Sequence, residues 1–429
     1  MLLALACRLP VAAEAGLTRA PPADLEGGNG AEVTLGRWRD AAVSLPLTTL
    51  ASVQTGRRRL ALRELPLPPV TPDSGLLKVE ATGVCGSDVG FYEQDRGPRI
   101  LGHEVVGTIA ALGAVAADRW GLCEGDRVVL EEYLPCGHCS FCRSSEFRLC
   151  QAADPSATPG ALRYGSTALD VSPGLWGGYS EYMYLHPRTV AHKLGPAVPA
   201  RLASLALPLA TGFEWTVSEG GAGLGSAVLV LGPGQQGLGC VLAAKQAGAA
   251  RVIVTGLPGD AHRLEVARQL GADHTLVAGP GFDLAAEVTA LLGGERPGII
   301  VDTAAGSEAT VPGALDAAAK RGVIVVPAWV PRPLRELDFY RITRKYLTVK
   351  GVRGHSFQAV EWAIGVIGGG HPGIGAMSSL DVGLAEVDAA IRGTGGELAQ
   401  PVIHATVSPG AASPPPTPTT PKPATGRTA

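Results

Sequence analysis

The sequence predicts an α/β protein with two domains, one rich in β-strands and one built on a parallel sheet with helices on both faces. Two patterns support this prediction. From about residue 200, runs of four to six apolar residues alternate with stretches of helical length, which is typical of a doubly wound parallel sheet. Between about residues 51 and 194, short strands and glycine-marked turns follow one another.

Length and composition limit the classes of function. The chain has 429 residues, which is enough for two domains with full cores. Its net charge is -3 and its Lys and Arg residues are scattered, so we expect no nucleic acid and no anionic membrane as a partner. The apolar run Met1–Cys7 lacks a basic flank and is shorter than the ~20 residues of a membrane span. A lipid-attachment site at Leu5-Ala6-Cys7 is the less favoured alternative, and we predict a cytoplasmic protein.

The β-rich domain is expected to begin after an N-terminal extension, residues 1–48, that is rich in Ala, Gly and Pro and is predicted to be disordered. Structure should start near Ala51, with an edge strand over 59–65 and a second strand over 76–81. We assign 49–198 to this domain. Residues 354–407 should rejoin it through a helix over 358–367 and a strand near Val402. Residues 408–429 are rich in Pro and Thr and should be disordered.

Residues 199–353 form the predicted parallel-sheet domain. Its strands are expected over 227–231, 251–255, 299–302, 323–326 and 346–352, and its first two helices over 237–247 and 260–270.

A glycine-rich turn follows the first of these strands. Residues 232–237 read Gly-Pro-Gly-Gln-Gln-Gly, which fits the dinucleotide-binding pattern between a strand and a helix. Gly232 would form the tight turn, Gly234 would let the backbone approach a pyrophosphate, and Gly237 would allow close packing. Gln235 and Gln236 lie at the helix N-terminus, where negative charge is favoured. The sequence therefore predicts a nicotinamide dinucleotide as the cofactor.

The choice between NAD and NADP stays open at the end of the second strand. Thr255-Gly256-Leu257 carries no acidic residue for the ribose hydroxyls. Asp260 follows in the loop, and Arg263 would suit a 2′-phosphate. Both residues could also be ordinary solvent-facing positions of a helix start.

Four cysteines lie in one short loop: Cys136, Cys139, Cys142 and Cys150. Thiolates at this spacing can complete a tetrahedral zinc shell, and a closed shell has a structural role. This cluster also favours a reducing compartment, and Cys7, Cys123 and Cys240 show no pairing pattern.

A second metal site is predicted from two loops. Gly83-Val84-Cys85-Gly86-Ser87-Asp88 and Gly102-His103-Glu104 offer a thiolate, an imidazole and a carboxylate. Three protein ligands leave one position open for water or substrate, as in catalytic zinc sites.

Over roughly residues 50 to 407, these motifs resemble the medium-chain dehydrogenase/reductase superfamily, in its zinc-dependent alcohol and polyol dehydrogenase branch. Within that branch, the motifs look like those of sorbitol and threonine dehydrogenases. The resemblance rests on Gly-His-Glu with Gly107 and Gly113 behind it, the cysteine loop, the stretch Gly177-Gly178-Tyr179-Ser180-Glu181-Tyr182 and the nucleotide turn. It implies a GroES-like catalytic domain and a Rossmann domain, two zinc ions per chain, NAD or NADP, and a homodimer or homotetramer.

The resemblance also implies residue roles. Cys85 and His103 would bind the catalytic zinc, and Glu104 would be a third ligand or a neighbour of the metal. Ser87 would take the proton of the alcohol, and Asp88 would orient the histidine ligand.

Two positions depart from the family pattern. Relatives often carry a Glu-Pro pair before the nucleotide domain, where this chain has Leu207-Pro208, and Gly90 stands where a relay histidine is frequent. Glu214 could compensate for the missing acid, although a surface carboxylate is the simpler interpretation.

The predicted reaction is hydride transfer between an alcohol (a secondary alcohol, polyol or amino alcohol) and NAD(P), with zinc polarising the substrate oxygen. Two alternatives are a zinc-independent enone or quinone reductase on the same fold, and a catalytically silent nucleotide-binding protein. Cys85 and His103 argue against the first, while Leu207 and Gly90 are the reason to consider the second.

Overall fold

The computed structural model describes residues 45–304, 310–327 and 337–410. Most of the predicted N-terminal extension and of the Pro/Thr-rich tail lies outside these residues. Within them, no helix has both the length and the apolar character needed to cross a bilayer.

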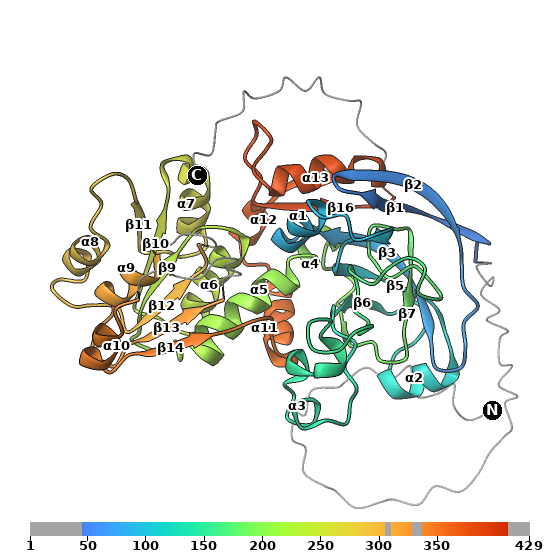
Figure 1. The fold of residues 1–429 in the computed structure, drawn as a ribbon, viewed down its shortest axis with the longest axis horizontal. Coiled ribbons are helices and arrows are strands. Elements are labelled where there is room, and N and C mark those ends of the chain that lie inside the picture. Colours follow the sequence, from blue (N-terminus) through green and yellow to red (C-terminus); the bar gives the residue numbers. More distant parts are fainter. Residues whose placement is uncertain (1–44, 305–309, 328–336, 411–429) are drawn as a thin grey trace, which may run out of the picture.

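The nucleotide-binding part is a six-stranded sheet in which every neighbouring pair is parallel (Figure 1). The strand order is β11-β10-β9-β12-β13-β14, which is the Rossmann order with its switch point between β9 and β12. The strands are β9 (Ala227–Leu231), β10 (Arg251–Gly256), β11 (His274–Val277), β12 (Ile299–Asp302), β13 (Val323–Val326) and β14 (Thr348–Gly351). The helices between them are α6 (Gln235–Gln246), α7 (Ala261–Gln269), α8 (Leu284–Leu291), α9 (Thr310–Ala317) and α10 (Phe339–Lys345).

Strand β9 shows why this sheet was predictable. Val228 and Val230 join the apolar cluster formed with α6 and α7, whereas Leu229 and Leu231 join the cluster formed with α8 and α9. Because both faces of a parallel sheet are covered by helices, the strand reads as a continuous apolar run.

The β-rich part contains two sheets. A seven-stranded sheet has the order β15-β16-β3-β5-β6-β8, with β7 pairing with β3, and a three-stranded sheet has the order β2-β1-β4. Their strands are β1 (Thr48–Gly56), β2 (Arg59–Pro66), β3 (Gly75–Gly83), β4 (Arg99–Ile100), β5 (Glu104–Leu112), β6 (Arg127–Leu130), β7 (Tyr182–Leu185), β8 (Ala191–Lys193), β15 (Ser378–Val382) and β16 (His404–Val407). Short helices lie around them: α1 (Gly86–Tyr92), α2 (Ala114–Trp120), α3 (Ser140–Arg143), α12 (Ile374–Met377) and α13 (Val387–Thr394).

Strand β1 corrects the predicted start of structure near Ala51, because it begins at Thr48 and pairs with β2 along its length. Its four central residues, 51–54, are all buried, and two of them, Ser52 and Gln54, are polar. The strand therefore shows neither alternation nor an apolar run. The side-chain nitrogen of Gln54 donates to backbone carbonyls and lies 3.0 Å from both Phe91 O and Gln94 O.

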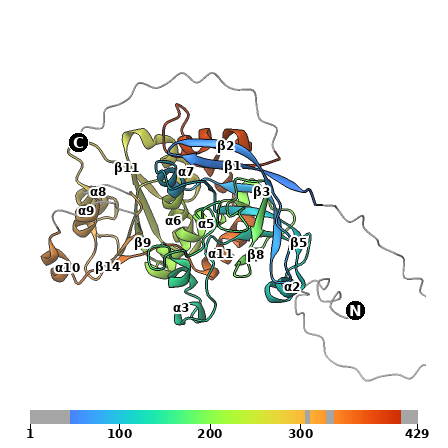
Figure 2. The same cartoon turned by 45° about the vertical axis from the view of Figure 1, so that its right-hand side comes forward.

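Helices α4 (Ala200–Ala203), α5 (Ala206–Phe213) and α11 (Phe357–Gly368) connect the two parts. Figure 1 shows α5 and α11 between the parallel sheet and the β-rich part, and Figure 2 keeps α5, α6 and α11 together in the middle of the molecule. A Cβ atom on Gly212 would lie 2.2 Å from the carbonyl carbon of Gly239, so α5 and α6 cross in direct backbone contact. This contact holds the connecting helix α5 directly against the first helix of the parallel-sheet part.

Candidate metal centres and nucleotide loop

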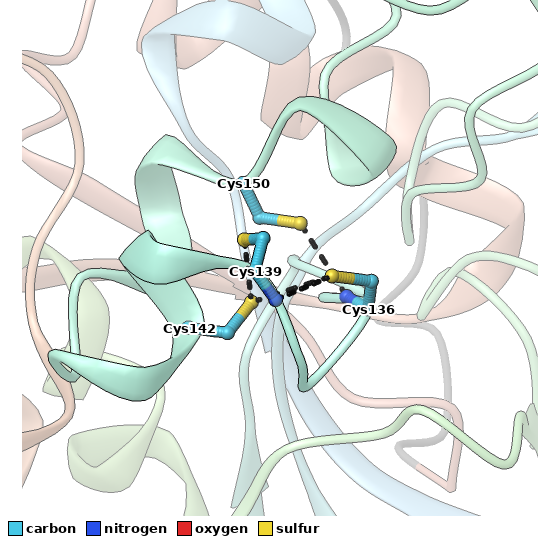
Figure 3. Close-up of side chains that lie close together, drawn as sticks. All are labelled: Cys136, Cys139, Cys142 and Cys150. Carbon is cyan, nitrogen blue, oxygen red and sulfur yellow. Dashed lines mark hydrogen bonds between the residues drawn. The ribbon is translucent and has the colours of Figure 1, made fainter.

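The four cysteines converge on one point beside α3, as Figure 3 shows. Their sulfur atoms all lie within 4.8 Å of one another, and Cys142 Sγ is 3.5 Å from Cys139 Sγ and 3.9 Å from Cys136 Sγ. A Zn–S bond of about 2.3 Å in tetrahedral geometry requires sulfur atoms about 3.8 Å apart. Backbone N–H groups of Cys136 and Cys139 donate to Cys150 Sγ and Cys136 Sγ, each at 3.4 Å. The geometry and the donor set both fit a zinc ion.

Arg148 anchors this cysteine lobe (residues 136–150) to the rest of the molecule. Its buried guanidinium pairs with Glu214 at 2.8 Å and with Glu219 at 3.3 Å, both in the π-helical continuation of α5, Glu214–Glu219. Glu214 also accepts hydrogen bonds from the backbone and hydroxyl of Ser356. The prediction of a surface carboxylate at Glu214 is therefore wrong: the side chain is buried because it neutralises Arg148, and it is not part of a metal cluster.

Cys85, His103 and Glu104 form the second cluster, with ligand atoms within 4.8 Å of one another. The sheet explains this proximity. Cys85 follows β3, Glu104 begins β5, and the antiparallel register pairs Gly83 with Glu104. Residues about twenty positions apart in the sequence are thus adjacent at one end of the two central strands.

Asp88 faces the Nδ1 side of His103. Its Oδ1 lies 3.6 Å from His103 Nδ1, and its Oδ2 accepts hydrogen bonds from Cys85 N at 3.0 Å and from the hydroxyl of Tyr179 at 3.1 Å. Asp88 is fully buried. A carboxylate fixed against one ring nitrogen leaves the other, Nε2, available to a metal.

Glu104 has the environment that most clearly suits a metal ligand. Its Oε2 is buried and has no hydrogen-bond partner within the described structure, and such an orphaned acceptor is costly unless a cation binds it. Burial is the main reason why the pKa of this carboxyl is raised to about 8. A Cβ atom on Gly83 would lie 2.2 Å from Oε2, so only glycine fits beside it. Thiolate, imidazole and carboxylate together fit a zinc ion.

The other oxygen of Glu104 faces a hydrogen-bond chain that sequence reasoning missed. Gln235 Nε2 lies 3.5 Å from Glu104 Oε1, and Gln235 Oε1 lies 3.0 Å from His404 Nδ1. Ser204 Oγ lies 3.0 Å from His404 Nε2. Burial lowers the pKa of His404 to about 3, so this imidazole is neutral. The side chain of Gln235, predicted at the cofactor, thus contacts the metal cluster.

Glu132 is a second side chain that sequence reasoning missed. Its Oε2 lies 3.8 Å from His103 Nε2, and its Oε1 accepts a hydrogen bond from Arg163 at 2.5 Å. Burial alone would raise the pKa of Glu132, but Arg163 and His103 outweigh it and lower this pKa to about 2. The preceding Glu131 instead contacts His192 and His355.

The remaining predicted residues around the metal have plain environments. Ser87 is half-buried in the first turn of α1, and Gly90 follows in the same helix. Leu207 is buried in the apolar cluster at the start of α5. Leu207 therefore contributes packing where many relatives carry an acid.

The glycine turn lies between β9 and α6. Gly232 has φ +96°, a conformation that favours glycine, and a Cβ atom on Gly237 would lie 2.0 Å from Gly232 O. Thr303 Oγ1, just past β12, donates to Gly232 O at 2.8 Å. Gly234 is the N-cap of α6 and has open space around it, so backbone N–H groups at the helix start are free to meet a phosphate.

At the end of β10, Asp260 organises the loop after Thr255 and Gly256. Its Oδ2 accepts a hydrogen bond from Leu257 N at 2.9 Å, and its Oδ1 pairs with Arg263 Nη1 at 3.1 Å. Arg263 Nη2 also donates to Val402 O at 3.1 Å. Arg263 is therefore already engaged by two acceptors.

Comparison with known proteins gives a consistent picture. Residues 71–196 match the model of the alcohol dehydrogenase GroES-like domain, and residues 237–367 match that of the zinc-binding dehydrogenases. A Mycobacterium tuberculosis protein named "Probable alcohol dehydrogenase" is 40% identical over 283 residues, covering 64% of this chain and 74% of that protein. Sorbitol dehydrogenase of Mus musculus is 31% identical over 286 residues, which cover 65% of this chain and 74% of that protein. An Escherichia coli CFT073 alcohol dehydrogenase solved with NADH has a TM-score of 0.72 and 25% identity, covering 85% of this chain and all of the other.

Proposed function

This chain belongs to the zinc-dependent medium-chain alcohol and polyol dehydrogenase family, and from that premise we propose that Cys85, His103 and Glu104 carry its catalytic metal. The reaction is hydride transfer between an alcohol and NAD(P). The observation that most supports this assignment of residues is the buried, unpartnered Oε2 of Glu104 beside a thiolate and an imidazole.

The residues around this cluster have distinct tasks. When bound, zinc supplies a Lewis acid that polarises the substrate oxygen. Asp88 holds His103 in one orientation, because its carboxylate is itself fixed by Cys85 N and by Tyr179. Ser87, half-buried and two residues after Cys85, would relay the hydroxyl proton of the alcohol, passing its own proton to water as it accepts the substrate's. The glycine turn holds the pyrophosphate at the N-terminus of α6.

The two zinc sites and the reaction can be tested together. We expect purified protein to contain two zinc ions per chain and to oxidise secondary alcohols or polyols with NAD or NADP. Metal analysis and a turnover screen across alcohols, with both cofactors in parallel, would check this. A metal-free preparation that reduces enones at full rate would instead support a zinc-independent reductase. Cofactor binding without turnover across the whole screen would support a silent nucleotide-binding protein.

We further propose that NAD is the preferred cofactor. The carboxylate of Asp260 lies at the end of β10 and would repel a 2′-phosphate, while Arg263 is engaged by Asp260 and Val402. Asp260→Ser is expected to raise the ratio of kcat/KM for NADP over that for NAD by about tenfold or more, because it removes a like charge. Glu265→Ser, an exposed carboxylate on the same helix, is the matched control and should leave the ratio unchanged. A wild-type preference for NADP would contradict the proposal.

Two coarser properties complete the proposal. A homodimer or homotetramer is supported by β14, an edge strand of the described sheet that is flanked by the exposed aromatic residues Tyr340 and Tyr346. A reducing, cytoplasmic location is supported by the free thiols of both clusters, which must be reduced to bind metal.

A further inference from the structure

Glu132 is a half-buried carboxylate whose chemistry the proposed reaction does not use. It follows β6, and its side chain lies against His103. Two facts make it informative: the nitrogen of His103 that its Oε2 faces, and the lack of any hydrogen bond to that oxygen within the described structure.

The first fact places Glu132 on the metal side of His103. Asp88 faces Nδ1 at 3.6 Å, so Nε2 is the nitrogen left for a metal. Glu132 Oε2 lies 3.8 Å from that same Nε2. The compact set of ligand atoms formed by Cys85, His103 and Glu104 does not include this carboxylate. Glu132 therefore borders the metal site from outside the set of three ligands.

The second fact concerns the ion pair with Arg163. The guanidinium holds Oε1 at 2.5 Å and also lies over the ring of Tyr133, 4.5 Å from its centroid. Within the described structure, no hydrogen bond reaches Oε2. Arg163 thus fixes the position of the carboxylate and leaves one acceptor oxygen directed toward the metal side.

We propose that Glu132 is a specificity-determining residue, and that its free oxygen accepts a hydrogen bond from a donor on the carbon next to the reacting one. The favoured substrates are then vicinal diols and 2-amino alcohols, and this inference rests on the proposed function. A substrate with a carboxylate at the same position meets like charge from Glu132 and from Glu104. Leu207 adds no acid to the site, so Glu132 supplies the polar recognition that an apolar helix start cannot.

A series of four matched alcohols tests this inference. Propan-2-ol, propane-1,2-diol, 1-aminopropan-2-ol and lactate share one secondary alcohol and differ only in a neighbouring CH₃, CH₂OH, CH₂NH₃⁺ or COO⁻ group. With the zinc-loaded enzyme, kcat/KM should be highest for the amino alcohol and the diol and lowest for lactate. In Glu132→Gln, the advantage of 1-aminopropan-2-ol over propan-2-ol should fall about 10- to 100-fold, because a hydrogen bond to a charged group is lost.

Two further measurements make the outcome decisive. Calorimetric titration of the zinc-loaded enzyme with 1-aminopropan-2-ol and propan-2-ol gives the same comparison without turnover, and metal analysis reports whether Glu132→Gln keeps both zinc ions. If Glu132→Gln fails to fold because Arg163 is left unpaired, the double variant Glu132→Gln/Arg163→Met removes both charges and is used in place of the single variant.

Unchanged selectivity in Glu132→Gln, or loss of a zinc ion from it, would overturn the inference, the latter because Glu132 would then be a metal ligand. Turnover of propan-2-ol without any dependence on the neighbouring group also overturns it while leaving the proposed function intact. Absence of turnover with all four alcohols contradicts the proposed function instead. In that case, the calorimetric comparison of 1-aminopropan-2-ol with propan-2-ol still decides the role of Glu132.

Discussion

Cys85→Ser is expected to reduce alcohol turnover by about 10³-fold or more and to lower the zinc content from two ions per chain to one. A metal acting as Lewis acid contributes several kcal/mol to stabilising the transition state, and each 1.36 kcal/mol corresponds to a factor of ten in rate. Serine replaces a thiolate, the softest of the three expected ligands, with a neutral hydroxyl. Steady-state kinetics and metal analysis on the same preparation would measure both effects.

Cys240→Ser is the matched control for this experiment. Cys240 is a fully buried free thiol in α6 and belongs to neither cluster. Its replacement should leave two zinc ions and turnover in place. Turnover that survives in Cys85→Ser would remove Cys85 from the catalytic site, even if the protein still bound cofactor.

The sequence allowed the prediction of elements whose signals are local. The strands of the parallel sheet are continuous apolar runs because helices cover both faces of the sheet. In β9, Val228 and Val230 pack into the apolar cluster on one face, and Leu229 and Leu231 pack into the cluster on the other face. The cysteine loop and the glycine turn are likewise short patterns whose geometry depends on their own backbone. Strand β1 was missed because its buried residues include the polar Ser52 and Gln54, which interrupt the apolar pattern. Carbonyl groups of a neighbouring loop hold the side-chain nitrogen of Gln54, and this contact leaves no signal in the sequence.

The rest of the site depends on packing between distant segments. Gln235 belongs to the glycine turn, yet its side chain reaches Glu104 and His404, because α5 and α6 bring the nucleotide-binding part against the end of β5. The buried Glu214 shows the same limit, since only the fold brings Arg148 of the cysteine lobe to it. Glu131 and Glu132 are neighbours with different partners, and residue type alone does not reveal which of them faces His103.

The contact between Gln235 and Glu104 links two functions. One end of this side chain belongs to the loop expected to hold the pyrophosphate, and the other lies 3.5 Å from an expected metal ligand. His404 fixes the amide from its opposite side, with Ser204 behind it. The side chain of Gln235 thus places the start of the nucleotide loop in contact with an expected metal ligand.

Cys142→Ser is expected to have the opposite signature to Cys85→Ser: a large loss of stability and a small effect on turnover per folded molecule. A structural zinc contributes about 10–16 kcal/mol of binding free energy that is coupled to folding. Because Arg148 ties the lobe to Glu214 and Glu219, loss of the zinc should also separate the buried Glu214 from Arg148, whereas Glu219 keeps Lys350 as a partner. Removing one partner of such a buried pair costs about 3–5 kcal/mol.

Three measurements would check this expectation: the thermal midpoint, the zinc content and the rate of limited proteolysis within residues 136–150. The midpoint should fall clearly, one zinc should be lost, and cleavage in the lobe should accelerate, whereas Cys85→Ser should leave the lobe resistant. Cys240→Ser again serves as the control for replacing a thiol. A Cys142→Ser protein with two zinc ions and an unchanged midpoint would contradict a structural zinc held by these four cysteines, because removing one of the four sulfur atoms would then affect neither the metal nor the loop.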